Sequence, residues 1–293
     1  MSSLPQRVRI VEVGPRDGLQ NEPITVPTAD KVRFITMLAE AGLTDIEVGA
    51  FVSPQRVPRM ADTAEVLAQL PSLPFVRYIT LVPNLRGLER AMAAGARAIA
   101  VFTAASDTFN QRNVGMRIAD SLREFHTLIP AAKDAGLWVR GYVSTAFVCP
   151  YEGPIAPEQV VPVAQALLDM GADEISIGDT IGHATPEDVA RLNRTLLPVV
   201  PLSRLAYHLH DTRGNALSNV QQALRDGIAI FDASAGGLGG CPFAPGAPGN
   251  LATESLLDLL HDLEIETGVD RARLAEATRF LTSRIGRPQH EHS

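Results

Sequence analysis

A buried strand that ends in two histidines is predicted by the stretch Leu205-Ala206-Tyr207-His208-Leu209-His210-Asp211. Side chains alternate between the two faces of a strand, so His208 and His210 should project to one side while Leu209 points away. Two imidazoles on one face, at the polar end of an apolar strand, can share one divalent cation. The alternative is a pair of hydrogen-bonded interior histidines, which this stretch alone does not exclude.

The composition is that of a globular protein with a large core, because 45% of the 293 residues are hydrophobic and 20% are charged. A net charge of −7 argues against nucleic acid as the main partner. Two cysteines, Cys149 and Cys241, cannot form a disulfide scaffold and fit a reducing compartment. The sequence has no apolar signal core and no run of about eighteen apolar residues. We therefore expect a cytoplasmic protein without a membrane partner.

Eight short runs of β-forming residues are each followed by a helical pattern. The strands are expected at 8–13, 45–51, 76–82, 98–104, 138–146, 174–178, 205–210 and 228–233. The helices are expected at 29–41, 60–70, 85–94, 118–135, 157–170, 186–197, 215–225 and 250–261. Strict alternation with apolar strands indicates a parallel sheet covered on both faces, and eight units close into a (β/α)8 TIM barrel. A doubly wound open sheet is the alternative.

We predict one domain over residues 1–293, with the barrel core at about 8–262 and an additional C-terminal helix at about 270–284. In such a barrel the catalytic groups gather at the C-terminal ends of the strands. Polar residues that are unusual for buried strands do fall at these ends: Arg16, Asp17, Glu47, Asp179, His208, His210 and, after the last strand, the glycine-rich run 236–242 and Asn250.

Each of these features has a structural alternative. Arg16 and Asp17 would fit a surface turn, Glu47 a buried ion pair and Asp179 a helix cap. The glycine-rich run would fit a loop without a catalytic part. Their common position at one end of the strands favours an active site with a catalytic lid loop.

A divalent-metal site is predicted from four of these residues: Asp17, His208, His210 and Asn250. One carboxylate with imidazole and amide ligands suits Mg²⁺ or Mn²⁺, with Zn²⁺ or Co²⁺ as alternatives and open positions for substrate. Arg16 beside such a cation can stabilise an enolate oxygen as it develops. This arrangement predicts aldol- or Claisen-like carbon–carbon cleavage, or its reverse.

Three further residues are candidates for proton transfer or ligand orientation. Glu47 and Asp179 can orient metal ligands or relay a proton. Cys241, on the glycine-rich run, can close over the site and supply a proton to a carbanion. The alternative for Cys241 is a small hydrophobic side chain without a chemical role.

Motifs along most of the chain resemble those of hydroxymethylglutaryl-CoA lyases, within the DRE-TIM metallolyase superfamily. They are VEVGPRDGLQNE at 11–22, FVSP at 51–54, RGYVS at 140–144, CPYEG at 149–153, GDTIG at 178–182, HLHDT at 208–212, GLGGCP at 237–242 and GNLATE at 249–254. Because they occur in order from residue 11 to residue 254, the resemblance is specific.

The resemblance implies a barrel that cleaves 3-hydroxy-3-methylglutaryl-CoA to acetyl-CoA and acetoacetate, with Mg²⁺ or Mn²⁺ as cofactor. It implies metal ligands at Asp17, His208, His210 and Asn250, and catalytic roles for Arg16, Asp17, Glu47, Asp179, His208 and Cys241. The implied substrate-binding residues are Arg16, Gln20, Ala50, Asn113, Ser144 and Thr180. The expected partners are an acyl-CoA substrate and one or more further copies of the chain.

Four positions depart from the family pattern: Ala50, Val148, His183 and Arg213. They fall near the expected pocket, so the acyl group stays open, with citramalyl-CoA or longer branched 3-hydroxyglutaryl-CoA esters as alternatives. A pyruvate-dependent barrel aldolase or synthase would share the metal site but should lack the motifs at 149–153 and 237–242. A non-catalytic barrel should have lost a metal ligand, and none is lost.

Overall fold

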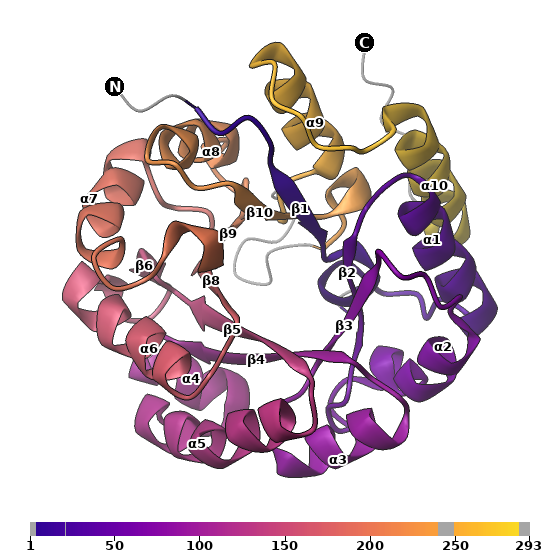
Figure 1. Ribbon diagram of the computed structural model, residues 1–293, viewed down its shortest axis with the longest axis horizontal. Coiled ribbons are helices and arrows are strands. Elements are labelled where there is room, and N and C mark those ends of the chain that lie inside the picture. The colour runs from indigo at the N-terminus through magenta and orange to yellow at the C-terminus, as the bar shows by residue number, and fades with distance from the viewer. Residues whose placement is uncertain (1–3, 21, 240–248, 287–293) are drawn as a thin grey trace.

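The computed structural model describes residues 4–20, 22–239 and 249–286 and contains a closed barrel of parallel strands surrounded by helices (Figure 1). Around the barrel the order is β1 (Arg9–Glu12), β10 (Ile230–Ala233), β9 (Leu205–Leu209), β8 (Glu174–Asp179), β5 (Trp138–Ser144), β4 (Ala98–Ala104), β3 (Arg77–Leu81) and β2 (Asp45–Ala50). The prediction of a (β/α)8 barrel is confirmed.

The helices follow the strands in sequence and lie outside them (Figure 1). They are α1 (Thr28–Glu40), α2 (Thr63–Gln69), α3 (Leu85–Ala93), α4 (Asp107–Val114), α5 (Ile118–Asp134), α6 (Pro157–Asp169), α7 (Pro186–Leu196), α8 (Ala216–Arg225), α9 (Thr253–Asp262) and α10 (Arg271–Ile285). Shorter turns are η1 (Gly14–Gly18), η2 (Pro58–Met60), η3 (Leu202–Arg204) and η4 (Ala235–Gly237). The predicted C-terminal helix is α10, which packs against α1.

Apart from the short turns, one helix and one hairpin were not predicted. Helix α4 begins after Ser106, whose hydroxyl accepts a hydrogen bond from the Phe109 amide at 3.0 Å. Its sequence is mostly polar, so hydrophobic periodicity does not indicate it. A hairpin of β6 (Val148–Cys149) and β7 (Gly153–Pro154) lies beyond the barrel strand β5.

The last barrel helix begins three residues later than predicted, and this difference matters for the site. Asn250 is extended and forms an antiparallel bridge with His210 instead of opening the helix. The next amide, that of Leu251, donates to the Leu209 carbonyl at 3.1 Å. Asn250 is therefore placed beside the end of β9, and helix α9 starts only at Thr253.

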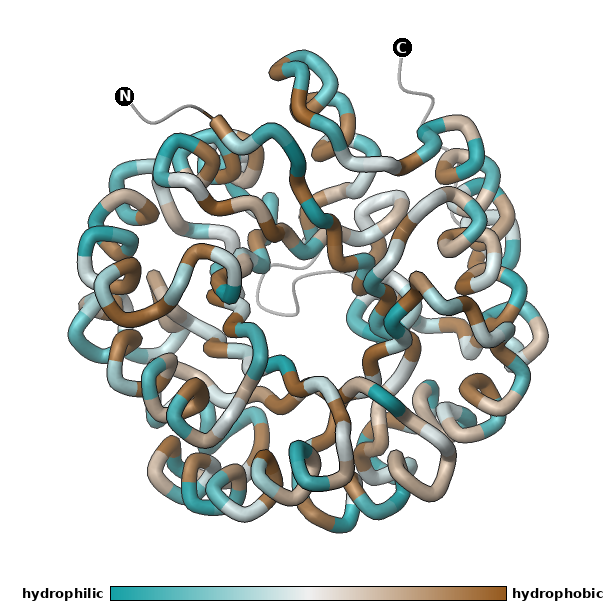
Figure 2. Tube along the Cα trace, viewed as in Figure 1, coloured by the Kyte–Doolittle hydropathy of each residue, from teal (hydrophilic) through white to brown (hydrophobic). Residues whose placement is uncertain are grey.

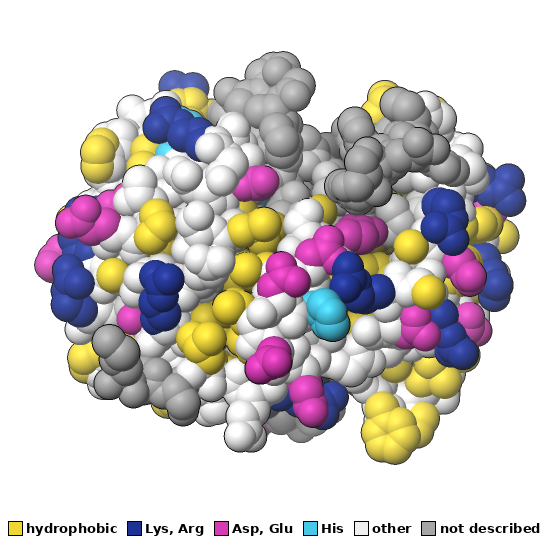
Figure 3. Space-filling model, turned by 90° about the horizontal axis from the view of Figure 1, so that it is seen from above, with side chains coloured by type: hydrophobic (Ala, Val, Ile, Leu, Met, Phe, Trp, Pro, Cys, Tyr) yellow, Lys and Arg dark blue, Asp and Glu magenta, His cyan; other side chains and the backbone are white. Residues whose placement is uncertain are grey.

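The core has an apolar outer layer and a charged interior. Hydrophobic positions recur on the strands and on the helices around them (Figure 2), and Phe34, Leu128 and Leu167 are completely buried. Inside the barrel, however, Arg140 is completely buried among charged partners. On the surface, side chains of both charges are interspersed on the face shown in Figure 3. No helix in the described part of the chain is long and apolar enough to span a bilayer.

Candidate active site and metal centre

A tight turn at the end of β1 carries Arg16 and Asp17 into the mouth of the barrel. The amides of Arg16, Asp17 and Gly18 all lie within hydrogen-bonding distance of the Val13 carbonyl, at 3.2, 2.8 and 3.2 Å. Glycine is required at Gly18 because an added Cβ would lie 2.8 Å from the Leu238 Cβ. The sequence VGPRDG thus folds as a turn packed directly on the segment that follows β10.

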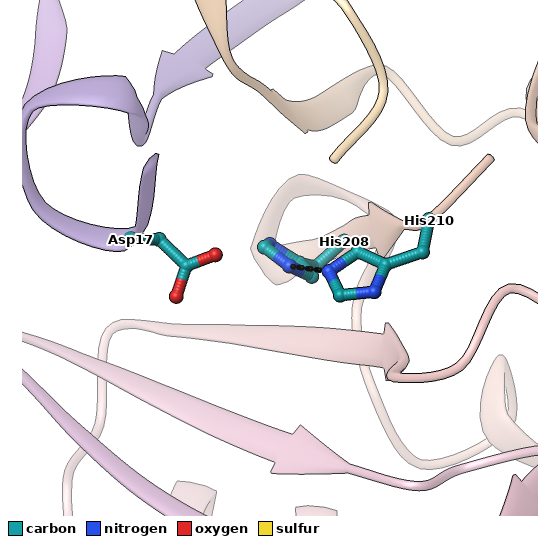
Figure 4. A group of neighbouring side chains, drawn as sticks. All are labelled: Asp17, His208 and His210. Carbon is teal, nitrogen blue, oxygen red and sulfur yellow. Dashed lines mark hydrogen bonds between the residues drawn. The ribbon is translucent and has the colours of Figure 1, made fainter. Parts of the chain in front are cut away.

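Asp17, His208 and His210 come together at the carboxyl end of the strands (Figure 4). Each offers a ligand atom, and these atoms all lie within 4.8 Å of one another. The two Nε2 atoms are 3.2 Å apart, which confirms that both histidines project to the same side of the strand. Adjacent ligands of an octahedral cation with bonds of about 2.1 Å would be separated by about 3 Å, so this spacing fits one shared ion.

His208 is oriented by a residue that sequence reasoning missed. Its Nδ1 lies 3.1 Å from Oδ2 of Asp232, on the neighbouring strand β10. Burial alone would raise the pKa of Asp232, but the charge of Arg140 outweighs this and holds the pKa low. An ionised carboxylate only accepts, so a proton belongs on Nδ1, and in the neutral imidazole Nε2 is then the nitrogen that can bind a cation.

Two of the three side chains have pKa shifts that favour the protonation state a cation needs, whereas the pKa of His208 shifts the other way. Burial lowers the pKa of His210 to about 4, and neighbouring His208 contributes to this. Burial alone would raise the pKa of Asp17, but the charges of Arg16 and His208 outweigh it and bring the pKa to about 2. For His208 the hydrogen bond and charge of Asp232 overcome desolvation and raise the pKa.

Asn250, the fourth predicted ligand, lies beside this group but presents its amide nitrogen. Its Nδ2 donates to Oδ2 of Asp17 at 2.8 Å and to the Leu238 carbonyl at 3.0 Å. An amide binds a cation through its oxygen, so ligation would require the side-chain amide to turn over. In this structure Asn250 connects Asp17 to the segment after β10.

Arg16 is held by two carboxylates and still has an unused donor. Its Nη1 lies 2.6 Å from Oδ1 of Asp17, and its Nη2 lies 2.6 Å from Oε2 of Glu47. The Nε of Arg16 and the Oε1 of Glu47 are buried without a hydrogen-bond partner among the described residues. Buried polar atoms are usually paired, so both atoms are available to a polar group that is not among the described residues.

A buried network of hydrogen bonds connects His208, through Asp232, to Glu47. Arg140 donates through Nη2 to Oδ1 of Asp232 at 2.5 Å and through Nη1 to the Tyr142 hydroxyl at 2.8 Å. The Tyr142 hydroxyl lies 3.5 Å from Oε2 of Glu47. Arg140 also donates to Glu174 at 2.8 Å. In the sequence these residues are charged side chains at inward positions of apolar strands, a pattern from which we predict no role for them.

Asp179 supports the loop after β8 and is not the helix cap considered as its alternative, because helix α7 is capped by Thr185. Its two carboxylate oxygens accept the amides of His183 and Ala184, each at 3.0 Å, and so fix the loop after β8. Burial raises its pKa to about 6. Strand alternation explains this placement, because Gly178 pairs with His208 on the inward face and Asp179 follows it on the other face.

The remaining predicted residues are distributed along the same end of the barrel. Gln20 follows η1 and Ser144 ends β5, and both are half-buried, whereas Asn113 is exposed on α4. Ala50 ends β2, and its amide donates to the Thr63 hydroxyl. The Thr180 hydroxyl accepts a hydrogen bond from the Thr145 amide. His183 is close enough to Arg213 for that charge to add to desolvation in lowering its pKa. Cys241 lies outside the described residues.

A closed (β/α)8 barrel with a carboxylate and two imidazoles converging at its carboxyl end defines a barrel enzyme with a possible metal site. The family model named HMGL-like matches residues 7–281. The chain belongs to the HMGL-like family, and it is a lyase.

Three relatives illustrate the similarity. The 3-hydroxy-3-isohexenylglutaryl-CoA/hydroxy-methylglutaryl-CoA lyase of Pseudomonas aeruginosa is 50% identical over 285 residues, which cover 97% of this chain and 95% of the relative. A solved hydroxymethylglutaryl-CoA lyase of Pseudomonas aeruginosa has 49% identity and a TM-score of 0.96, with 99% and 96% covered. An HMG-CoA lyase of Acinetobacter baumannii, solved with coenzyme A and 3-methylmalate, has 37% identity and a TM-score of 0.93, with 100% and 95% covered.

Proposed function

We propose that this lyase cleaves 3-hydroxy-3-methylglutaryl-CoA to acetyl-CoA and acetoacetate. The observation that carries this proposal is the Nε of Arg16, which has no partner among the described residues, beside the group of Asp17, His208 and His210. The names of the similar lyases supply the substrate class. Neither citramalyl-CoA nor a pyruvate-dependent reaction is favoured by these relatives.

The donor set fits Mg²⁺ or Mn²⁺, held by Asp17, His208 and His210, with Asn250 as a further ligand after its amide turns over. Its fit rests on the 3.2 Å separation of the two Nε2 atoms and on the Asp17 carboxylate in the same group. When bound, such an ion lowers the pKa of a substrate hydroxyl and polarises a carbonyl.

In the reaction, the 3-hydroxyl loses its proton and the bond between C2 and C3 breaks. The C3–O bond becomes the ketone of acetoacetate, and the released electron pair forms the thioester enolate. A proton delivered to C2 then gives acetyl-CoA. Arg16 donates to the enolate oxygen, and its guanidinium is already fixed by Glu47 and Asp17, so little reorganisation is needed.

We assign the removal of the hydroxyl proton to Glu47. Burial raises the pKa of Glu47, and its Oε1 has no hydrogen-bond partner within the described part of the chain, so Glu47 is suited to receive the hydroxyl proton directly or through water. Asp179 acts by holding the loop after β8. Proton delivery to C2 by Cys241 stays a prediction.

The test compares 3-hydroxy-3-methylglutaryl-CoA with citramalyl-CoA, each with Mg²⁺, Mn²⁺ or EDTA under reducing conditions. We expect metal-dependent release of acetyl-CoA and acetoacetate from the first substrate, with a clearly higher kcat/KM. Preference for citramalyl-CoA would overturn the substrate and retain the reaction type. Absence of turnover with either, while metal still binds, would overturn the proposal. Light scattering on the same sample tests the predicted homo-oligomer.

A further inference from the structure

Two carboxylates from different elements hold adjacent amides of the turn η4. The Ala235 amide donates to Oε1 of Glu12 at 2.9 Å, and the Gly236 amide donates to Oε2 of Glu254 at 2.8 Å. Glu12 ends β1 and is completely buried, whereas Glu254 lies in the first turn of α9. Two successive amides of one short turn are thus each bound by a side-chain carboxyl group from another element, so the turn is anchored on both sides.

Glu12 also connects η4 to the turn that bears Arg16 and Asp17. Its Oε1 accepts the Gly14 amide at 2.9 Å, and its Oε2 accepts the Thr253 hydroxyl at 2.7 Å. A Cβ at Gly14 would lie only 2.7 Å from Oε1 of Glu12, so the two turns have little room to shift. One side chain thus joins the end of β1, the segment after β10 and the start of α9.

Glu254 extends this connection to the helix that follows the barrel. The Thr278 hydroxyl, on α10, donates to Oε1 of Glu254 at 2.6 Å. Gly236 has a φ of 65°, and a Cβ there would lie 2.8 Å from the Thr278 Cγ2. Helix α10 therefore packs directly on η4 and orients the carboxylate that binds it.

The anchored turn leads to the candidate metal ligands. Leu238, immediately after η4, accepts Nδ2 of Asn250 through its carbonyl at 3.0 Å. The same Nδ2 donates to Asp17 at 2.8 Å. A shift of η4 would therefore move Asn250 relative to Asp17, and metal ligands tolerate small displacements poorly.

We propose that Glu12 and Glu254 are positioning residues that set the separation of Asp17 and Asn250, and that Thr278 makes α10 part of this support. The activity arm of the test rests on the proposed function, whereas the metal-affinity and exchange arms do not.

The first experiment replaces Thr278 by Val, which keeps the shape of the side chain and removes the hydroxyl. The matched control is Thr282→Val, one turn further on α10, because the Thr282 hydroxyl bonds backbone carbonyls of its own helix and no other group among the described residues. Thr278→Ser restores the hydroxyl and is the rescue variant. For each protein we would measure the Mn²⁺ dissociation constant by electron paramagnetic resonance, amide exchange at Gly236, the thermal midpoint, and kcat and KM.

We expect Thr278→Val to weaken Mn²⁺ binding and lower kcat by about tenfold, with faster exchange at Gly236 and a smaller change in KM. Thr282→Val should match the wild type in metal affinity, and Thr278→Ser should recover it. Equal Mn²⁺ affinity and equal Gly236 exchange in Thr278→Val and the wild type would overturn the proposal. Weaker Mn²⁺ binding by Thr278→Val, with no cleavage by any variant, would overturn the proposed function and support the positioning role.

A double-mutant cycle separates positioning from a general loss of stability. If Thr278 acts through Glu254, adding Thr278→Val to Glu254→Ala should change Mn²⁺ affinity by less than about twofold, because the connection is already lost. Independent effects that multiply in the double variant would show that Thr278 acts by another route, and the proposal would fail.

Discussion

Arg16 shows how a single residue can combine a structural and a chemical role. Its guanidinium contacts Asp17 and Glu47, yet its Nε has no partner among the described residues. Burial alone would lower the pKa of Arg16, but the charges of the Glu47 and Asp17 carboxylates outweigh burial and raise this pKa. The sequence predicted an enolate-stabilising arginine from its place after the first strand, and the structure adds the carboxylates that fix its orientation.

Replacing Arg16 by Gln should remove most of the turnover and leave metal binding nearly intact. The loss of a preorganised donor to a developing oxyanion lowers kcat by about 10² to 10³-fold. Gln can still donate to Glu47, so the buried carboxylate keeps one partner. Steady-state kinetics and Mn²⁺ titration check this, with exposed Arg123→Gln on α5 as control. Equal loss of turnover and metal affinity would mean that Arg16 mainly supports the metal site or the fold.

Removal of His210 should weaken metal binding and abolish activity together. His210→Ala deletes one of the converging Nε2 atoms, and Asp17→Ala deletes the carboxylate of the same group. We expect at least a tenfold weaker Mn²⁺ affinity for both variants, measured by calorimetry. Exposed His261→Ala is the control. Unchanged affinity in either test variant would remove that residue from the ligand set.

At the scale of elements, the loops at the two ends of the barrel have different tasks. Those after the strands carry the site, whereas those after the helices lie at the opposite end and serve stability. Gly42 and Gly136 follow α1 and α5 in this second group, and both have a positive φ, of 99° and 78°. They differ in surroundings, because a Cβ at Gly42 would lie 2.3 Å from the Gly268 carbonyl oxygen, while one at Gly136 would meet nothing within 4 Å.

Replacing each of these two glycines by alanine should therefore lower the stability by a different amount. Gly136→Ala should lower the free energy of unfolding by about 1–2 kcal/mol, the cost of a left-handed backbone for a residue with a Cβ. Gly42→Ala should lower it by a further ~1–3 kcal/mol through the steric clash. Urea unfolding followed by circular dichroism measures both, and kcat of the folded enzymes should stay unchanged. Equal losses would show that the chain near Gly268 relaxes freely.

At the scale of the whole molecule, ionisable residues join segments that are far apart in the sequence. Arg140 joins β5, β8 and β10 inside the barrel, and Glu12 joins β1 to α9 on the other side of the sheet. Burial raises the pKa of Glu12 from 4.5 to about 8, despite the hydrogen bonds of Thr253, Ala235 and Gly14, which favour the charged form. The folded protein therefore binds this proton more tightly than the unfolded chain.

The stability that Glu12 contributes therefore falls as the pH rises. Between about pH 4.5 and 8 the folded state holds more protons at Glu12, so the contribution of Glu12 to stability is full below about 4.5 and is lost as the pH rises to about 8. The side chain introduced in the Glu12→Gln variant is neutral at every pH. As the pH rises from about 4.5 to 8, the free energy of unfolding of the wild type should therefore fall relative to that of the variant, by up to about 1.4 kcal/mol per pH unit. Urea unfolding of both proteins at pH 5, 6, 7 and 8 measures this. A pH-independent difference would show that Glu12 has no raised pKa.

The sequence by itself determined the alternation of strands and helices, the end of the barrel at which polar residues gather, and the facing of His208 and His210. These features depend on local periodicity and on strand alternation, which are properties of neighbouring residues. The tertiary structure decided that Asp232 orients His208, that Asp179 holds a loop, and that Asn250 presents its nitrogen to Asp17.

The physical reason is the closure of the barrel. Strand β1 pairs with β10, so residues more than two hundred positions apart become neighbours, as Asn250 and Asp17 do. Which of their polar atoms then meet depends on register and on the burial of competing charges, and periodicity along the chain contains neither.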